Sequence, residues 1–330
     1  MRIVIEDECW THDDATWRQE MVRLLITLEE KRQHSIDTDI EKMASWCAIS
    51  NPEFVQVLPT RAMTISPRAG AVTLTVHPGG ASEVLCDPPW RLTASAARGC
   101  VKRPLKLVVE NDLSDRRFVA ASIPAFQTWE SSEWIEAVNG GGSHLLNIID
   151  HAKRRPDSRW RTFFLFDSDR LHPDELSADW TRPGGDGCQG FEFERRCAEI
   201  PDAMPKTRWH RLNRRSIENY LPNTLLQNVD LSAAQALASG EVGEMAKFYN
   251  MKRGLKGDWI KPKDGTTNII RRGRSKGAWE RLPEAIQSSL MEGFGEHVAE
   301  QFKNVLPTEP WPQDVRDEAD ALELALLDAL

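Results

Sequence analysis

The 330-residue sequence predicts an α/β protein in which a parallel sheet is flanked by helices. Three short, mainly apolar segments carry this prediction: Leu105–Val109, Trp134–Val138 and Thr162–Phe166. A continuous apolar run as short as Thr162–Phe166 is typical of a strand buried on both faces of a parallel sheet. Helical patterns separate the runs, and repeated strand–helix–strand units form parallel sheets with right-handed crossovers. We therefore expect a central α/β domain over residues 101–222.

The regions on either side of this domain have different patterns. Residues 1–100 contain an amphipathic helix, with an apolar stripe from Trp17 to Leu28, and short β-like runs such as Ala71–Val76. They predict a small mixed α/β domain of unknown role. Residues 223–330 are mostly helical by pattern and include a basic block. The acidic segment from Asp314 onward predicts a helix that docks on the body of the protein or on a second subunit, as in a homo-oligomer.

Composition limits the class of protein. The chain is 40% hydrophobic and 28% charged, and none of its apolar runs approaches the length of a membrane span. Its first residues are too acidic for a signal peptide, so we expect a cytoplasmic protein without a membrane partner. The six cysteines form no CxxC pair, which indicates neither a zinc site nor a disulfide framework. A net charge of −8 disfavours a protein coated in nucleic acid but permits a local basic track.

Two aspartates follow the third apolar run directly. Asp167 and Asp169 stand one residue apart, and residues two apart on a strand share a face. Ligands of open α/β sheets bind beyond the carboxyl ends of the strands. Paired carboxylates at that edge suit Mg²⁺ or Mn²⁺. The alternative is a strand end with two solvated aspartates.

Further acids occur at matching places along the chain. Glu110 closes the first apolar run, and Glu218 lies in a later Ile-Glu-Asn-Tyr-Leu segment. Together with the Asp-x-Asp pair, this order resembles the TOPRIM domain, in particular the nucleases of the OLD family (overcoming lysogenization defect). The resemblance covers about residues 105–222 and extends weakly to about 258. It implies a TOPRIM-like parallel sheet as the catalytic domain.

The resemblance also implies roles for individual residues. Members of the family hydrolyse phosphodiester bonds of nucleic acids with one or two divalent metal ions. Glu110 matches a metal ligand or general acid/base, and Asp167, Asp169 and Glu218 match metal ligands. OLD-type nucleases also use a downstream lysine near the scissile phosphate. Lys252 is the first candidate for that lysine and Lys256 is the second, so both are candidate catalytic residues.

The chain departs from the family pattern after the first acid. The family usually reads Glu-Gly-x-x-Asp, whereas this chain reads Glu-Asn-Asp-Leu-Ser-Asp over 110–115. Asp112 and Asp115 are therefore both candidates for the second acid, and Asp115 is counted among the metal ligands. The chain contains no G-x-x-x-x-G-K-[ST] motif. An ATPase or nucleotide-driven sensor that works with this protein would be a separate subunit.

A basic block lies downstream of these acids. Nine lysines and arginines but only two acids occur between Lys252 and Lys276. Such a density of positive charge favours contacts with the phosphates of nucleic acid. The alternative is a basic surface loop that offsets an acidic protein. The residues expected to bind nucleic acid are Lys252, Arg253, Lys256, Arg271, Arg272 and Arg274.

These observations favour a divalent-metal-dependent endonuclease that acts on DNA or RNA. The resemblance adds phage defence as its context. One alternative is a catalytically inert TOPRIM-like subunit that binds nucleic acid or a partner protein, and metal-dependent cleavage separates the two. Another is a phosphatase of the haloacid dehalogenase kind, which also carries Asp-x-Asp after a strand. A topoisomerase is disfavoured because Tyr220 and Tyr249 are the only tyrosines and no second topoisomerase module is recognisable.

Overall fold

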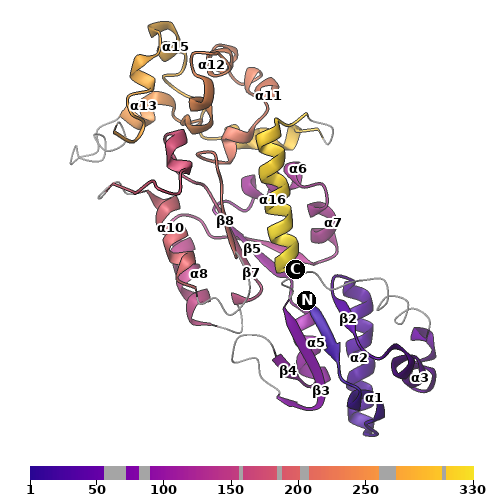
Figure 1. The fold of residues 1–330 in the computed structure, drawn as a ribbon. Helices are drawn as coiled ribbons and strands as arrows, with labels where there is room; N and C mark the ends of the chain where they lie inside the picture. The colour runs from indigo at the N-terminus through magenta and orange to yellow at the C-terminus, as the bar shows by residue number, and fades with distance from the viewer. Residues whose placement is uncertain are drawn as a thin grey trace.

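The computed structural model describes residues 1–55, 72–81, 90–155, 159–183, 188–200, 208–259, 273–306 and 310–330. It contains two α/β units in succession, followed by a helical region (Figure 1). The first unit and the helices α11 to α15 lie at opposite ends of the molecule, with the second unit between them. No helix within the described ranges is long and apolar enough to cross a membrane.

The first unit is built on a four-stranded sheet of order β2-β1-β3-β4, in which all pairs are parallel. Helix α2 is the amphipathic helix that the sequence predicts. Asp14 caps it by accepting a hydrogen bond from the Trp17 amide at 2.8 Å, and its apolar stripe is buried. The elements are β1 (Arg2–Ile5), α1 (Glu8–Thr11), α2 (Ala15–Lys31), β2 (Ser35–Asp37), α3 (Ile40–Ser50), η1 (Pro52–Phe54), β3 (Thr73–Ala81), β4 (Trp90–Leu92) and α5 (Ala94–Lys102).

The second unit has a sheet of order β6-β5-β7-β8, and all of its pairs are parallel as well. The three apolar runs form β5, β6 and β7, so the prediction of an α/β protein with a parallel sheet flanked by helices is confirmed. The elements are β5 (Leu105–Val109), α6 (Ser114–Ser122), α7 (Phe126–Ser131), β6 (Ile135–Asn139), α8 (Ser143–Arg154), β7 (Thr162–Phe166), η2 (Pro173–Leu176), α10 (Gln189–Ala198) and β8 (Trp209–Arg211).

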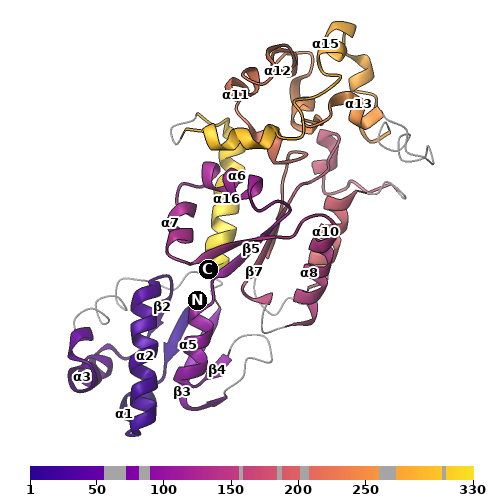
Figure 2. The same cartoon turned by 180° about the vertical axis from the view of Figure 1, so that it is seen from behind.

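Helices cover both faces of this second sheet. Side chains such as Leu107 and Leu165 belong to the core shared with α6 and the C-terminal helices. Val108 and Phe164 belong to the other core, which contains residues of α8 and α10. Figures 1 and 2 show α8 and α10 on one side of the sheet and α6, α7 and α16 on the other. The connections that follow β5 and β7 thus leave toward opposite faces, and this opens a crevice beyond the carboxyl ends of these two strands.

The C-terminal region consists of short helices and one long one. Helix α16 runs back along the second unit, and its buried Glu318 accepts hydrogen bonds from the Asn213 amide at 2.7 Å and from the Tyr220 hydroxyl. Of the two arrangements left open by the sequence, the structure shows docking on the body of the chain. The elements are η3 (Ile217–Tyr220), α11 (Asn223–Gln227), α12 (Leu231–Leu237), η4 (Gly243–Phe248), α13 (Gly254–Trp259), η5 (Trp279–Arg281), α15 (Glu284–Ser289), η6 (Val298–Asn304) and α16 (Gln313–Ala329).

Candidate active site

A cavity of about 420 Å³ lies beyond the carboxyl ends of β5 and β7. Its walls come from the start of α6, the loop before α8, the turn η3 and the segment that leads into η6. Six carboxylates and two cationic side chains line it, which makes it strongly acidic. These charged residues are Glu110, Asp115, Arg117, Asp167, Glu218, Lys252, Glu296 and Glu300.

Glu110 and Asp167 meet across the crevice between the two strands. Each is the first residue after its strand, and the Asp167 amide donates a hydrogen bond to Glu110 Oε1 at 3.0 Å. The amide of Ile217 in turn donates to Asp167 Oδ1 at 3.0 Å. Backbone groups therefore fix both carboxylates, while each keeps a second oxygen for other partners.

Asp115 reaches the same cavity from the first turn of α6. Its Oδ2 accepts from the Asn111 amide at 2.9 Å, and its Oδ1 accepts from the Ser114 hydroxyl at 3.1 Å. Asp112, the other candidate for the second acid, lines a separate hollow beside β6. The structure thus selects Asp115 over Asp112 as the acid that accompanies Glu110.

Glu218 and Lys252 form the far side of the cavity. Glu218 is 2% exposed, and its Oε1 forms an ion pair with the Lys252 ammonium at 3.0 Å. Its Oε2 is buried and has no hydrogen-bond partner in the described part of the chain. A buried carboxylate oxygen without a partner costs free energy, and this is a cost that a bound cation would remove.

The electrostatics of the cavity show a shortage of positive charge. Burial, followed by the charge of Asp169, raises the pKa of Glu110 to about 8. Burial also raises the pKa of Asp115 to about 6, and burial together with Glu110 raises that of Asp167 well above its ordinary value. For Lys252, burial lowers the pKa, but the neighbouring carboxylates outweigh burial and raise it to about 12. One ammonium therefore does not balance this group of acids.

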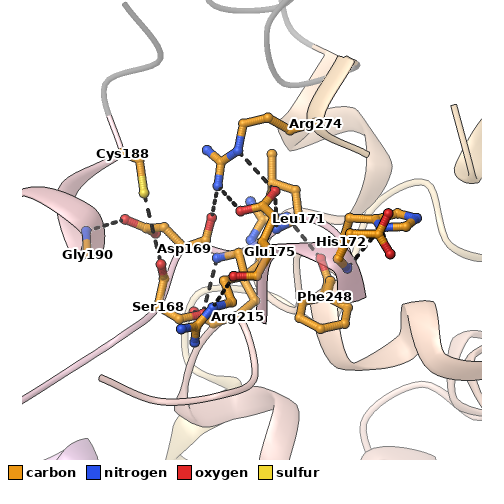
Figure 3. A network of polar contacts seen from close by, with 12 residues as sticks. Ser168, Asp169, Leu171, His172, Glu175, Cys188, Gly190, Arg215, Phe248 and Arg274 are labelled. Atoms are coloured by element: carbon orange, nitrogen blue, oxygen red, sulfur yellow. Dashed lines mark hydrogen bonds and ion pairs between the residues drawn. The ribbon is translucent and has the colours of Figure 1, made fainter. Parts of the chain in front are cut away.

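Asp169 departs from the geometry that the sequence predicts. Strand β7 ends at Phe166, and Asp169 adopts a left-handed backbone conformation with φ 55°. Its Oδ2 accepts a hydrogen bond from the Gly190 amide at 3.0 Å, as Figure 3 shows, and Asp169 does not line the cavity. The expectation that both aspartates share a face fails because the alternation of side chains holds only within a strand.

Gly190 is a part of this arrangement that sequence reasoning missed. A Cβ atom at this position would lie 2.4 Å from the Asp167 carbonyl oxygen, so only glycine lets the start of α10 approach so closely. A single glycine in a Gly-rich loop carries no signal that distinguishes it from its neighbours.

The basic block divides into residues with different surroundings. Lys252 lines the cavity, whereas Arg253 and Lys256 are exposed and pair with Glu296 at 2.7 Å and Glu292 at 3.0 Å. Arg271 and Arg272 lie outside the described residues.

Arg274 does not take the nucleic-acid contact expected of it. Its side chain is 3% exposed and forms a buried ion pair with Glu175 at 2.6 Å. It also donates a hydrogen bond to the Asp169 carbonyl oxygen at 2.9 Å (Figure 3). In this conformation Arg274 joins the segment after β7 to the C-terminal region instead of facing solvent.

A close contact between two backbone segments positions Lys252. The Phe294 amide donates to the Met251 carbonyl at 2.7 Å, and the Gly295 amide donates to the Lys252 carbonyl at 3.0 Å. Next to these bonds, a Cβ on Gly254 would lie 2.4 Å from the Gly293 nitrogen. Both of these glycines have positive φ, so glycine is required at the contact for two reasons.

The donor chemistry of the cavity suits a hard divalent cation. Its candidate ligands are carboxylate oxygens, one of them orphaned, and its net charge is negative. Within the described ranges, no three His, Cys, Asp or Glu side chains are grouped closely enough to hold a metal ion as they stand. For several of these carboxylates to ligate one ion, their oxygens would have to move closer together.

No protein-family model, curated protein or solved structure matches this chain. The geometry and charge of the cavity, together with the residue patterns of the sequence, are therefore what bears on its function.

Proposed function

We propose that this protein is a divalent-metal-dependent endonuclease that hydrolyses phosphodiester bonds of DNA or RNA, with Mg²⁺ or Mn²⁺ as its cofactor. One observation carries the proposal: four carboxylates and a lysine from five separate segments meet in one cavity at the carboxyl ends of adjacent parallel strands. That edge is where α/β sheets bind their ligands. The four carboxylates belong to Glu110, Asp115, Asp167 and Glu218, and the lysine is Lys252.

The four carboxylates are the proposed metal ligands. Burial and mutual repulsion make the charged forms of Glu110 and Asp167 unfavourable without a counter-ion, as their raised pKa values indicate. A bound divalent cation supplies Lewis acidity and lowers the pKa of a bound water, the two things that phosphodiester hydrolysis requires. Asp169 lies beside this set, and its carboxylate is held by the start of α10.

Lys252 has the properties of an electrostatic stabiliser of the reacting phosphate. Its pKa of about 12 keeps the ammonium charged at every physiological pH, so it serves as a fixed positive charge and not as a proton donor. Its side chain is 41% exposed, which leaves one side open to a substrate while Glu218 holds the other. A fixed positive charge near a phosphate stabilises the negative charge that develops on its oxygens in the transition state.

The resemblance to TOPRIM domains of OLD-type nucleases supports the same proposal. Three acids of the family pattern correspond to residues that line the cavity. They are the first glutamate, which matches Glu110, the first aspartate of the Asp-x-Asp pair, which matches Asp167, and the later glutamate, which matches Glu218. From this resemblance we extend the proposal to a cytoplasmic effector of phage defence, in which a separate ATPase or sensor subunit supplies the trigger.

A cleavage assay with matched aspartate variants tests the proposal. The purified chain is incubated with plasmid DNA, single-stranded DNA and total RNA, in Mg²⁺, in Mn²⁺ and in EDTA. We expect the unmodified chain to cut one substrate class in the presence of metal, and we expect the Asp167→Asn variant to have lost this activity. Asp169→Asn keeps an oxygen that accepts the Gly190 amide and is expected to retain most of the activity. Substrate binding without cutting under any metal would contradict the proposal and leave a nucleic-acid-binding subunit.

A further inference from the structure

Arg117 is a cationic side chain of the cavity that neither the sequence motifs nor the proposed metal site uses. It lies on α6, two residues after Asp115, and lines the cavity while remaining partly exposed. Within the described ranges, no carboxylate or hydrogen-bond acceptor holds its guanidinium, even though several acids line the same cavity. The guanidinium is therefore available to a ligand.

The neighbouring arginine shows that this is not a general property of the helix surface. Arg116 forms an ion pair with Glu130 at 2.5 Å and lines the separate hollow beside β6. Consecutive residues of a helix point about 100° apart, which accounts for the different surroundings of the two side chains. Two arginines of equal charge on one helix thus have different environments, one paired and one open.

The glycine-rich loop before α8 also contributes to the cavity. Gly142 lines the cavity and precedes α8, which is twelve residues long and has no side-chain cap at its start. The Gly141 amide donates to Asn139 Oδ1 at 2.8 Å, which shapes the loop. The His144 and Leu145 amides donate to the carbonyls of Gly141 and Gly142 at 3.1 and 3.3 Å, so it is the dipole of the helix that favours an anion at this end.

The orphaned oxygen of Glu218 is independent evidence that the cavity takes a ligand. Glu218 is 2% exposed, yet its Oε2 has no partner among the described residues. A cation held by the acids would satisfy this oxygen, and an anionic group of the substrate would balance that cation from the open side of the cavity. Arg117 and the loop before α8 supply positive potential of the kind such an anion needs.

We propose that Arg117, assisted by the start of α8, binds one backbone phosphate of the nucleic-acid substrate. This inference rests on the proposed nuclease function and names the group that holds the strand next to the reacting phosphate. A guanidinium suits the task because its planar fork matches phosphate oxygens with two parallel hydrogen bonds. A contact to phosphate orients the strand without reading its sequence, so the inferred role is in affinity and not in base specificity.

The test compares binding by variants of the two neighbouring arginines. Fluorescein-labelled single-stranded DNA and RNA, each about 20 nucleotides long, are titrated with the full chain in EDTA and in Ca²⁺ at several salt concentrations. Arg117→Ala should bind about tenfold more weakly than the unmodified chain, since a charge-assisted hydrogen bond is lost. Its salt slope should fall by about one. Arg117→Lys should recover part of the affinity, and Arg116→Ala should bind within about twofold of the unmodified chain.

The outcomes separate this inference from the proposed function. If the unmodified chain cuts or binds nucleic acid but Arg117→Ala binds as Arg116→Ala does, the phosphate contact is overturned while the nuclease stands. If Arg117→Ala weakens binding and no cutting occurs under any metal, the contact stands and the nuclease fails. If the unmodified chain neither binds nor cuts, both fail. Thermal unfolding of the two alanine variants shows whether α6 is intact in each.

Discussion

Replacing Glu110 with Gln should make the metal-free protein more stable at alkaline pH. In the folded protein the pKa of Glu110 is raised to about 8, whereas the carboxyl of the unfolded chain titrates near 4.5. Between these two values the folded state binds more protons than the unfolded state, so stability falls as pH rises. The glutamine cannot ionise, and its Oε1 can still accept a hydrogen bond from the Asp167 amide. The variant should therefore not lose stability as the pH rises.

The size of the effect follows from the same two pKa values. At about 1.4 kcal/mol per pKa unit, the difference between the folded and unfolded pKa values corresponds to roughly 5 kcal/mol of unfolding free energy. Relaxation of the structure and entry of water reduce this free energy to roughly half. We expect Glu110→Gln and the unmodified protein to be equally stable near pH 4.5, and the variant to be roughly 2 to 3 kcal/mol more stable above pH 8. Excess Mg²⁺ should narrow the difference, because a cation stabilises the ionised glutamate.

Urea denaturation in EDTA at a series of pH values measures this difference. Glu136→Gln is the matched control, because it makes the same change at an exposed carboxyl on the neighbouring strand β6. Equal pH dependence of Glu110→Gln and the unmodified protein would refute the reasoning. It would mean that Glu110 ionises normally in the folded protein.

Three further predictions follow from the surroundings of single residues. Lys252→Met should lower the single-turnover rate of cleavage at least about a hundredfold, because it removes the fixed positive charge from the cavity. Lys256→Met removes an exposed ion pair outside the cavity and should change the same rate less than about threefold. Arg274→Ala should lower the free energy of unfolding, measured by urea denaturation, by about 3 to 5 kcal/mol, because it leaves Glu175 buried without its partner. A decrease below about 1 kcal/mol would show that the pair is not buried in solution. Gly293→Ala should lower both stability and cleavage, since its Cβ would lie 2.4 Å from the Gly254 nitrogen and 2.9 Å from the carbonyl carbon of Lys252. Unchanged cleavage would show that this contact does not position Lys252.

Local patterns predicted the strands that carry the acids. The apolar runs before Glu110 and Asp167 mark buried strands by length and composition alone, and those strands are present. The adjacency of β5 and β7, and hence the crevice between their ends, is not encoded in any periodicity. It depends on which strands pair, and pairing is decided by the packing of helices that are distant in sequence.

The predictions that failed did so for physical reasons that the local sequence pattern does not carry. The sequence pattern predicts Asp169 beside Asp167, but the chain leaves the strand after Phe166, and Asp169 takes a left-handed conformation that only the structure reveals. The density of positive charge predicts Arg274 on a basic surface, because a count of charges does not register burial. Its partner Glu175 lies 99 residues away in the sequence. Arg117 carried no motif at all and is recognised only by its place in the cavity wall.

The most direct test of the account is a diffraction experiment on crystals of the protein soaked in Mn²⁺. The anomalous signal of manganese locates the ion independently of any assumption about ligands. We expect a peak in the cavity, within coordination distance of oxygens from Glu110, Asp167 and Glu218, with the Glu218 Oε2 now ligated. An occupied ion elsewhere, with the cavity empty at saturating Mn²⁺, would contradict the claim that these carboxylates form a metal centre.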